Sequence, residues 1–257
     1  MERPVVMVTG SNRNTGLGII KVFAAAGYDV IAACRSEENA RQTELALREQ
    51  FPESRVLGVA FNQRYPEQIT AGFAKVRQHF SRLDALVCNA TKISTRDSFM
   101  ELTPENLNEM LLTNVSGYAF TAQEAAKMMI PQHKGSIVMI SSVQSHGAVP
   151  RMMAYAASKA AINSVSRGIA LELARDGIRC NTLIAGAIRV DRLETLSPDE
   201  LAAKRKNWPT GRETTPEEIG NACLFLCSDQ AASITGSELN VDSGVEICLL
   251  PYNKDWK

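Results

Sequence analysis

The stretch that decides the fold reads Val5-Val6-Met7-Val8-Thr9-Gly10-Ser11-Asn12-Arg13-Asn14-Thr15-Gly16-Leu17-Gly18-Ile19. Its first five residues form a short run typical of a strand, and a helical pattern follows the last glycine. A glycine-rich turn here lets the backbone approach a pyrophosphate, while the helix N-terminus supplies unpaired N–H groups and positive potential. We therefore predict a dinucleotide-binding turn, with a purely structural turn as the alternative.

Short apolar runs alternate with longer amphipathic stretches along most of the chain. Several runs are apolar on both faces, as strands buried between two helical layers must be. The alternation predicts an α/β fold with a Rossmann-like, doubly wound parallel sheet in a three-layer αβα domain. The predicted strands are Val5–Thr9, Tyr28–Ala33, Arg55–Phe61, Ala85–Cys88, Ser136–Ser141, Arg179–Ile184 and Ser237–Val241. Two long helices are expected at Thr103–Ile130, closed by Pro131, and at Met152–Ala174.

The charge balance excludes two classes of partner. The 257 residues carry 28 Lys and Arg against 28 Asp and Glu, so the formal net charge is zero. A nucleic-acid binder needs a basic face, and so does a protein held on an anionic membrane surface. No apolar run is long enough for a membrane span, and the chain starts on a strand rather than a signal-peptide core. We expect a cytoplasmic protein with one domain over residues 1–257.

The segment 187–212 is polar, charged and irregular apart from a short helical stretch. In a doubly wound fold, a long segment after the sixth strand lies over the carboxyl edge of the sheet, where ligands bind. We therefore predict that residues 187–212 form a substrate lid.

Six cysteines are scattered along the chain, and no two form a C-x-x-C pair. Cys223 and Cys227 lie four apart in a helical pattern, which is half of a metal site at most, and no histidine is close in sequence. Reduced, mostly buried thiols and no metal site are the preferred interpretation.

The end of the second predicted strand carries no acidic residue. An NAD-binding site usually places an acid there to bind the ribose hydroxyls. Arg35 and Ser36 stand in that place instead, and Arg13 lies in the glycine turn. A cation and a hydroxyl suit a 2′-phosphate, so NADP(H) is predicted in preference to NAD(H). The alternative is that Arg35 is solvated and Ser36 merely caps the next helix.

A candidate catalytic group follows the fifth predicted strand, which ends in Ser141 and Ser142. Tyr155 comes thirteen residues after Ser142, and Lys159 follows four residues later. On a helix this spacing places the phenol and the ammonium on one face, one turn apart. The cation favours the phenolate and so draws the pKa of the tyrosine toward the working pH, as a general acid/base requires.

The order of these motifs resembles the classical short-chain dehydrogenase/reductase (SDR) family from Val5 to about Ile247. The matches are Thr9, Gly10, Gly16 and Gly18 for TGxxxGxG, Cys88-Asn89-Ala90-Thr91 for NNAG, Asn114 for a helix-kinking asparagine, Ser142 with Tyr155 and Lys159 for the serine and YxxxK, Ala185-Gly186 for Pro-Gly, and Thr235-Gly236 with Val241-Asp242-Ser243-Gly244 for TG and VDGG.

The resemblance implies an oxidoreductase that interconverts a ketone and a secondary alcohol by hydride transfer. Tyr155 exchanges a proton with the substrate oxygen, Lys159 supports it and holds the nicotinamide ribose, and Ser142 hydrogen-bonds the reacting oxygen. The main chain of Asn114 binds a water in a proton relay. The implied cofactor residues are Gly10, Ser11, Arg13, Thr15, Gly16, Leu17, Gly18, Arg35, Ser36, Asn62, Asn89, Ala90, Tyr155, Lys159, Gly186 and Ile188. The implied substrate residues are Ser142, Gln144, His146, Tyr155 and Ala187.

The sequence departs from the family pattern in the glycine turn. Gly10 and Gly16 lie six apart, so a turn lengthened by two residues is expected. Elsewhere, Ala185 replaces the proline, Thr91 the last glycine of NNAG, and Val190 a threonine that meets the nicotinamide carboxamide.

Two substrate classes remain open: steroid-like or other bulky secondary alcohols, and 3-oxoacyl thioesters on an acyl carrier protein. The second class favours a basic patch, for which Lys204-Arg205-Lys206 is a candidate. The four-residue spacing of Tyr155 and Lys159 disfavours an enoyl reductase. A non-catalytic NADP(H)-binding sensor is the alternative from another class. The resemblance also implies a homotetramer or homodimer, built through the two long helices, and a substrate choice set by the lid and residues 249–257.

Overall fold

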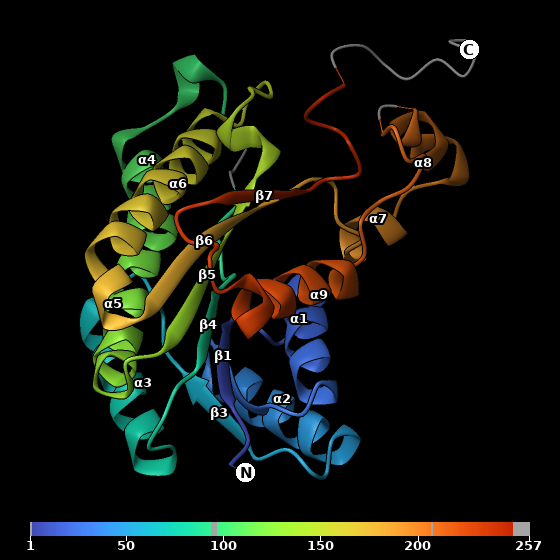
Figure 1. The fold of residues 1–257 in the computed structure, drawn as a ribbon. Coiled ribbons are helices and arrows are strands. Elements are labelled where there is room, and N and C mark those ends of the chain that lie inside the picture. Colours follow the sequence, from blue (N-terminus) through green and yellow to red (C-terminus); the bar gives the residue numbers. More distant parts are fainter. Residues whose placement is uncertain (1, 94–96, 207, 249–257) are drawn as a thin grey trace.

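The computed structural model describes residues 2–93, 97–206 and 208–248, so the tail at residues 249–257 lies outside the described part (Figure 1). Its centre is a seven-stranded parallel sheet in the order β3-β2-β1-β4-β5-β6-β7. The strands are β1 (Val5–Thr9), β2 (Asp29–Cys34), β3 (Val56–Ala60), β4 (Ala85–Cys88), β5 (Gly135–Ser142), β6 (Ile178–Ala185) and β7 (Glu238–Val241). The predicted doubly wound α/β fold is confirmed.

Helices cover both faces of the sheet. They are α1 (Asn14–Ala25), α2 (Glu37–Gln50), α3 (Pro66–His79), α4 (Pro104–Leu111), α5 (Gly117–Met129), α6 (Met153–Leu173), α7 (Asp191–Glu194), α8 (Pro198–Arg205) and α9 (Pro216–Cys227). In Figure 1, α1, α2 and α9 lie on one side of the sheet, and α3, α5 and α6 lie on the other.

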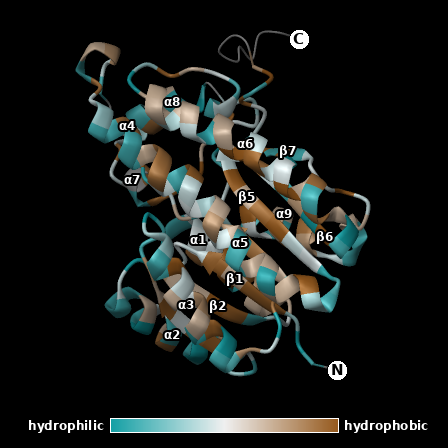
Figure 2. Ribbon diagram, turned by 90° about the vertical axis from the view of Figure 1, so that its left-hand side faces the viewer, coloured by the Kyte–Doolittle hydropathy of each residue, from teal (hydrophilic) through white to brown (hydrophobic). Residues whose placement is uncertain are grey.

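Each face of the sheet builds its own core because successive side chains of a strand point in opposite directions. From β1, Met7 joins a cluster with α3, α5 and α6, while Val6 and Val8 join a cluster with α1, α2 and α9. All residues of β1, β2, β4 and β5 are buried, which explains their nearly continuous apolar runs. Figure 2 shows β1, β2 and β5 largely brown, with teal residues gathered on the surrounding helices and loops.

The helix expected at Thr103–Ile130 is interrupted. Helix α4 ends at Leu111, a π-helical turn spans Leu112–Ser116, and α5 then continues to Met129. A short 3-10 turn at Ile130–Gln132 contains Pro131 and closes the segment as predicted. The π turn lies where the sequence predicted a kink around Asn114, and such turns are frequent at functional sites.

The chain crosses over between β3 and β4, so β1 and β4 lie side by side at the centre. Ligands of doubly wound folds bind outside the carboxyl ends of the strands at this reversal. The segment 187–212 carries α7 and α8, which Figure 1 shows at that end of the sheet. In the described residues, none of the helices combines the length and the apolar character needed to cross a bilayer.

Candidate active site

The predicted catalytic residues lie on strand β5, which ends at Ser142, and on helix α6, which carries Tyr155 and Lys159. Tyr155 lies in the first turn of α6, and the Nζ atom of Lys159 lies 5.6 Å from the centre of the Tyr155 ring. The Oγ atom of Ser141 donates to the main-chain oxygen of Lys159 at 3.1 Å and so ties α6 to the end of β5. Ser141 thus holds the helix against the strand.

Lys159 is almost fully buried, with 1% of its surface exposed. Its Nζ donates to the Ile140 carbonyl at 2.8 Å and lies 5.4 Å from the ring centre of Tyr118. No carboxylate partners it in the described residues, and burial lowers the pKa of Lys159 to about 7. Burial also raises the pKa of Tyr118 well above its ordinary value, so the Tyr118 side chain beside the ammonium is uncharged. A lysine in this state changes its protonation readily near neutral pH.

Asn114 lies in the π turn with its side chain wholly buried. Its Oδ1 accepts from the Lys92 N–H at 2.8 Å, and its Nδ2 donates to the Lys92 carbonyl at 3.0 Å. The same Nδ2 lies 3.0 Å from the Oγ atom of Ser158, the residue before Lys159. Asn114 therefore joins the loop after β4 to helix α6, and its amide is used in holding the site together.

Ser142 ends β5 and is 8% exposed. Its Oγ accepts from the Gln144 N–H at 3.2 Å and so caps the 3-10 turn Val143–Ser145. The Oε1 atom of Gln144 is shielded from solvent and has no hydrogen-bond partner among the described residues. Two of the predicted substrate residues thus lie next to each other, and one retains an unused acceptor.

The glycine turn is not lengthened, contrary to the sequence prediction. Only residues 10–13 separate β1 from α1, because the helix begins at Asn14. Asn14 has a φ of 49°, in the left-handed region that favours glycine. Laid over Thr9–Gly16, the pattern TGxxxGxG therefore places Asn14 at its second glycine and Gly16 at its third. The gap between Gly10 and Gly16 hid this because asparagine is the other residue that enters this conformation.

The glycines of the turn permit close backbone contact. A Cβ atom on Gly10 would lie 2.9 Å from the Cα atom of Ala90, and one on Gly16 would overlap the Gly10 carbonyl. A Cβ on Gly18 would overlap Pro216 at the start of α9, so this glycine serves helix packing. The turn is thus closed tightly against the residues after β4.

A cavity of about 880 Å³ opens beside this turn. Eight of the predicted cofactor residues line it: Gly10, Arg13, Thr15, Gly16, Arg35, Asn62, Asn89 and Ala90. The other eight lie outside its lining: Ser11, Leu17, Gly18, Ser36, Tyr155, Lys159, Gly186 and Ile188. Of these, Ser36 caps α2 by accepting from the Asn39 N–H at 3.3 Å. Ser11 is fully buried behind the turn. The volume falls within the range of about 300–1,000 Å³ typical of ligand sites.

Several residues of this cavity escaped the sequence prediction, among them Asn14, Gln63, Arg64, Lys92 and Asp191. The Nε2 atom of Gln63 donates to the carbonyls of Ala90 at 2.7 Å and Thr113 at 2.8 Å. The Gln63 Oε1 atom is buried without a partner in the described part of the chain. An unpaired buried acceptor in a cavity wall fits a ligand that brings a donor. The available sequence signal for Gln63 was its position directly after Asn62, a predicted cofactor residue.

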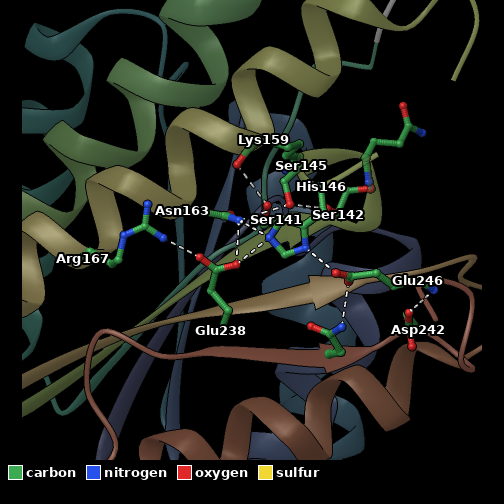
Figure 3. Close-up of polar contacts among 12 residues, drawn as sticks. Ser141, Ser142, Ser145, His146, Lys159, Asn163, Arg167, Glu238, Asp242 and Glu246 are labelled. Atoms are coloured by element: carbon green, nitrogen blue, oxygen red, sulfur yellow. Dashed lines mark hydrogen bonds and ion pairs between the residues drawn. The ribbon is translucent and has the colours of Figure 1, made fainter. Parts of the chain in front are cut away.

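The ring of His146, a predicted substrate residue, contacts two carboxylates. Figure 3 shows its ring between Glu238 and Glu246, with Asn163 and Arg167 close by. Ala187, another predicted substrate residue, accepts from the Thr214 N–H at 3.0 Å through its carbonyl. Cys34, Cys88, Cys180 and Cys223 are buried, Cys227 and Cys248 are partly buried, and all six are free thiols. The described residues contain no cluster of His, Cys, Asp and Glu that would hold a metal ion.

Comparison with known proteins gives a consistent assignment. A family profile described as Enoyl-(Acyl carrier protein) reductase matches residues 10–246. A 3alpha-hydroxysteroid dehydrogenase of Mediterraneibacter gnavus is 34% identical over 242 residues, which cover 94% of this chain and 96% of that protein. A 3-oxoacyl-(acyl-carrier-protein) reductase of Escherichia coli is 33% identical, with coverage of 95% and 98%.

Solved structures agree in fold. A gluconate 5-dehydrogenase of Burkholderia cenocepacia, in complex with NADP and tartrate, superposes with a TM-score of 0.89 at 27% identity. The superposition covers 97% of each chain.

Proposed function

Because the chain belongs to the classical short-chain dehydrogenase/reductase family, we propose that it is an NADP(H)-dependent oxidoreductase that interconverts a ketone and a secondary alcohol. The observation that carries the proposal is the burial of Lys159 beside the Tyr155 ring, one residue from the Ser158–Asn114 hydrogen bond. Such a lysine serves proton transfer, whereas a binding module has no use for it.

The glycine turn and the cavity fit a dinucleotide. The N-terminus of α1 and the backbone of Gly10 would hold its phosphates, and Asn89 and Ala90 would border the adenosine ribose. The unpaired Gln63 Oε1 would accept a donor of the base. When bound, a nicotinamide cofactor supplies the redox chemistry of the reaction.

The side chains of the chain manage one proton. Tyr155 would give a proton to the substrate oxygen in reduction and remove it in oxidation, acting as general acid/base. The Lys159 ammonium would favour the phenolate form of Tyr155, and Ser142 Oγ would donate to the reacting oxygen. The Asn114 backbone, with a water, would connect Lys159 to solvent.

Arg35 supports NADP(H) over NAD(H). It lines the cavity together with Arg13, at the end of β2 where an acid would serve NAD(H). Two cations near one wall suit a dianionic phosphate. The NADP in the related gluconate 5-dehydrogenase structure agrees with this preference.

For the substrate we propose a bulky secondary alcohol of the steroid type, as the name of the hydroxysteroid dehydrogenase relative suggests. The second candidate, a 3-oxoacyl thioester, has the support of the 3-oxoacyl reductase relative at almost the same identity. Of the basic triplet that would receive an acyl carrier protein, Arg205 is engaged with Glu213 by a bidentate contact of 3.0 and 3.2 Å. The spacing of Tyr155 and Lys159 continues to favour carbonyl over enoyl reduction.

The proposal includes the segment 187–212 as a substrate lid and a homotetramer or homodimer. One face of α6 exposes a row of small and apolar side chains from Met153 to Leu171, and Leu171 itself is 82% exposed. Leu112 in the π turn and Phe120 on α5 are also exposed. Light scattering at micromolar concentration tests the assembly, and a 28 kDa particle would refute it.

The decisive experiment follows cofactor absorbance with NADPH and with NADH across steroid, 3-oxoacyl and small-ketone panels. We expect turnover with NADPH, and a loss of about 100-fold or more in Tyr155→Phe, which removes the proton donor. Tight NADPH binding with no turnover above the Tyr155→Phe level on any carbonyl would favour the sensor alternative.

A further inference from the structure

One histidine ring connects two parts of the chain that are far apart in sequence (Figure 3). The Nε2 atom of His146 lies 2.7 Å from Glu238 Oε2, and the Nδ1 atom lies 2.6 Å from Glu246 Oε1. His146 follows the turn that starts at Ser142, Glu238 begins β7, and Glu246 lies beyond the end of β7. The ring therefore joins residues 142–146, here called the Ser142 loop, to the segment 242–246 through Glu246.

The contacts require the imidazolium form. A neutral imidazole donates from one nitrogen only, whereas both nitrogens of His146 face carboxylate oxygens, which accept. Partial burial disfavours the charge, but the hydrogen bonds of Glu246 and Glu238 outweigh it and raise the pKa of His146. A proton on this ring is thus part of the folded arrangement.

The surrounding groups hold the two glutamates unequally. From α6, Arg167 Nη1 donates to Glu238 Oε1 at 2.5 Å, and Asn163 Nδ2 donates to Glu238 Oε2 at 3.0 Å and lies 3.2 Å from His146 Nε2. From β7, Asn240 Nδ2 donates to Glu246 Oε2 at 2.7 Å. Among the described residues, Glu238 therefore keeps a cation when His146 is neutral, and Glu246 keeps only the amide of Asn240.

The segment 242–246 also touches the base of the lid. The Glu246 N–H donates to Asp242 Oδ2 at 2.8 Å, and Asp242 packs against Gly186 after β6. Ser243 accepts from the Thr210 N–H at 3.3 Å and shares a 3.1 Å hydroxyl contact with Thr214. A displacement of the segment 242–246 would therefore disturb the contacts that it makes with Gly186, at the end of β6, and with residues 210–214.

The Ser142 loop is rigid from its first residue to the histidine. Ser145 Oγ donates to the Ser142 carbonyl at 2.7 Å, and the His146 N–H donates to the Val143 carbonyl at 3.2 Å. Asn163 Nδ2 also donates to Ser145 Oγ at 3.1 Å. A displacement of the His146 ring is therefore transmitted to Ser142 through the hydrogen bonds within residues 142–146.

We propose that His146 is a positioning residue for the reaction, which as an imidazolium clamps the Ser142 loop to the segment 242–246 and so sets the placement of Ser142. This proposal rests on the proposed function, since Ser142 is there the partner of the reacting oxygen. The proton on His146 takes no part in the chemistry. Its loss at alkaline pH releases Glu246, and the catalytic serine loses its support.

The test compares two variants at His146 across the pH range. In His146→Gln the clamp is absent at every pH, whereas His146→Arg keeps a cation that does not titrate and offers donors to both glutamates. The ratio of wild-type kcat/KM to that of His146→Gln should be about 3- to 10-fold at pH 6 and approach 1 above the pKa of the histidine. For His146→Arg, the ratio of its kcat/KM to that of His146→Gln should not fall at alkaline pH. The control His79→Gln changes a remote histidine on α3, and the ratio of wild-type kcat/KM to that of this variant should be 1 at every pH.

Hydrogen exchange of the peptide containing residues 242–248 gives a readout that does not need turnover. In the cofactor-free protein at pH 6, this peptide should exchange several-fold faster in His146→Gln than in wild type, and His146→Arg should restore protection. Unchanged exchange, or a kcat/KM ratio that is flat with pH, would overturn the clamp. Wild-type protein without turnover on any carbonyl would instead overturn the proposed function. The exchange measurement would still test whether His146 holds the segment 242–246.

Discussion

Asn14 and Asp191 exchange two hydrogen bonds although they lie 177 positions apart in the chain. Asn14 Nδ2 donates to Asp191 Oδ2 at 3.2 Å, and the Asp191 N–H donates to Asn14 Oδ1 at 3.1 Å. Asn14 begins α1 behind the glycine turn, Asp191 begins α7, and both line the large cavity. The pair thus connects the glycine-turn side of this cavity to the start of the predicted lid.

We predict that Asn14→Gly releases NADPH about 2- to 10-fold faster than wild type, because the net loss of the exposed pair is about 0.5–1.5 kcal/mol. Glycine keeps the left-handed φ, so the fold should be unaffected. Asn14→Ala loses the pair as well and also pays about 1–2 kcal/mol of backbone strain, which would show as a lower Tm. Stopped-flow displacement measures the release. Additive effects of Asn14→Gly and Asp191→Ala in the double variant would contradict a direct link.

Burial of Lys159 predicts a stability that depends on pH. Below a pKa of about 7 the folded, cofactor-free protein holds a buried ammonium. Between this value and about 10.4 the folded state releases the proton while the unfolded state keeps it, so stability rises with pH. Lys159→Met should therefore raise the Tm by several degrees, and by more at pH 6 than at pH 9. Lys204→Met changes an exposed lysine and should show no such trend. An equal gain at both pH values would contradict the burial of charge.

Asn114 predicts a large loss of stability on truncation. Asn114→Ala leaves the N–H and carbonyl of Lys92 without their partner, at about 1–3 kcal/mol for each group. Urea unfolding should show a decrease of roughly 2–6 kcal/mol. Asn108→Ala, on an exposed position of α4, should stay within about 0.5 kcal/mol of wild type. A small effect of Asn114→Ala would mean that water replaces the amide.

The position of Arg35 predicts a change of cofactor preference. Arg35→Asp should lower kcat/KM with NADPH by about tenfold or more, since a charged hydrogen bond contributes about 1.5–3 kcal/mol. The acid should improve or preserve activity with NADH by binding the ribose hydroxyls. Arg41→Asp, on the exposed side of α2, serves as the matched control. Equal activity with both cofactors in wild type, unchanged by Arg35→Asp, would contradict the preference for NADP(H).

The sequence was most informative where burial alone sets the structure. Strand β2 was predicted at Tyr28–Ala33 and is found at Asp29–Cys34, since a strand with both faces buried needs an apolar residue at nearly every position. The placement of Tyr155 and Lys159 one turn apart on a helix was also predictable, because it depends only on their four-residue spacing.

Features that depend on backbone conformation or distant contacts were not predictable. The left-handed φ of Asn14 is a property of one residue, and spacing between glycines does not reveal it. The π turn at Leu112–Ser116 interrupts a segment whose apolar pattern is that of a continuous helix. His146 meets Glu238 and Glu246 across 92 and 100 positions, which no local pattern records.

The π turn also determines how the segment between Pro104 and Met129 responds to a change of chain length. A π turn accommodates one residue more than an α turn, so the extra residue is absorbed within the turn and α5 keeps its orientation. Deleting one residue from Leu112–Ser116 would therefore give a regular α-helix with Tyr118 and the rest of α5 still facing the sheet, but the turn that carries Asn114 would be lost. An apparent defect of the helix is thus what positions Asn114, and a regular backbone would keep the core while losing the contacts of Asn114 with Lys92 and Ser158.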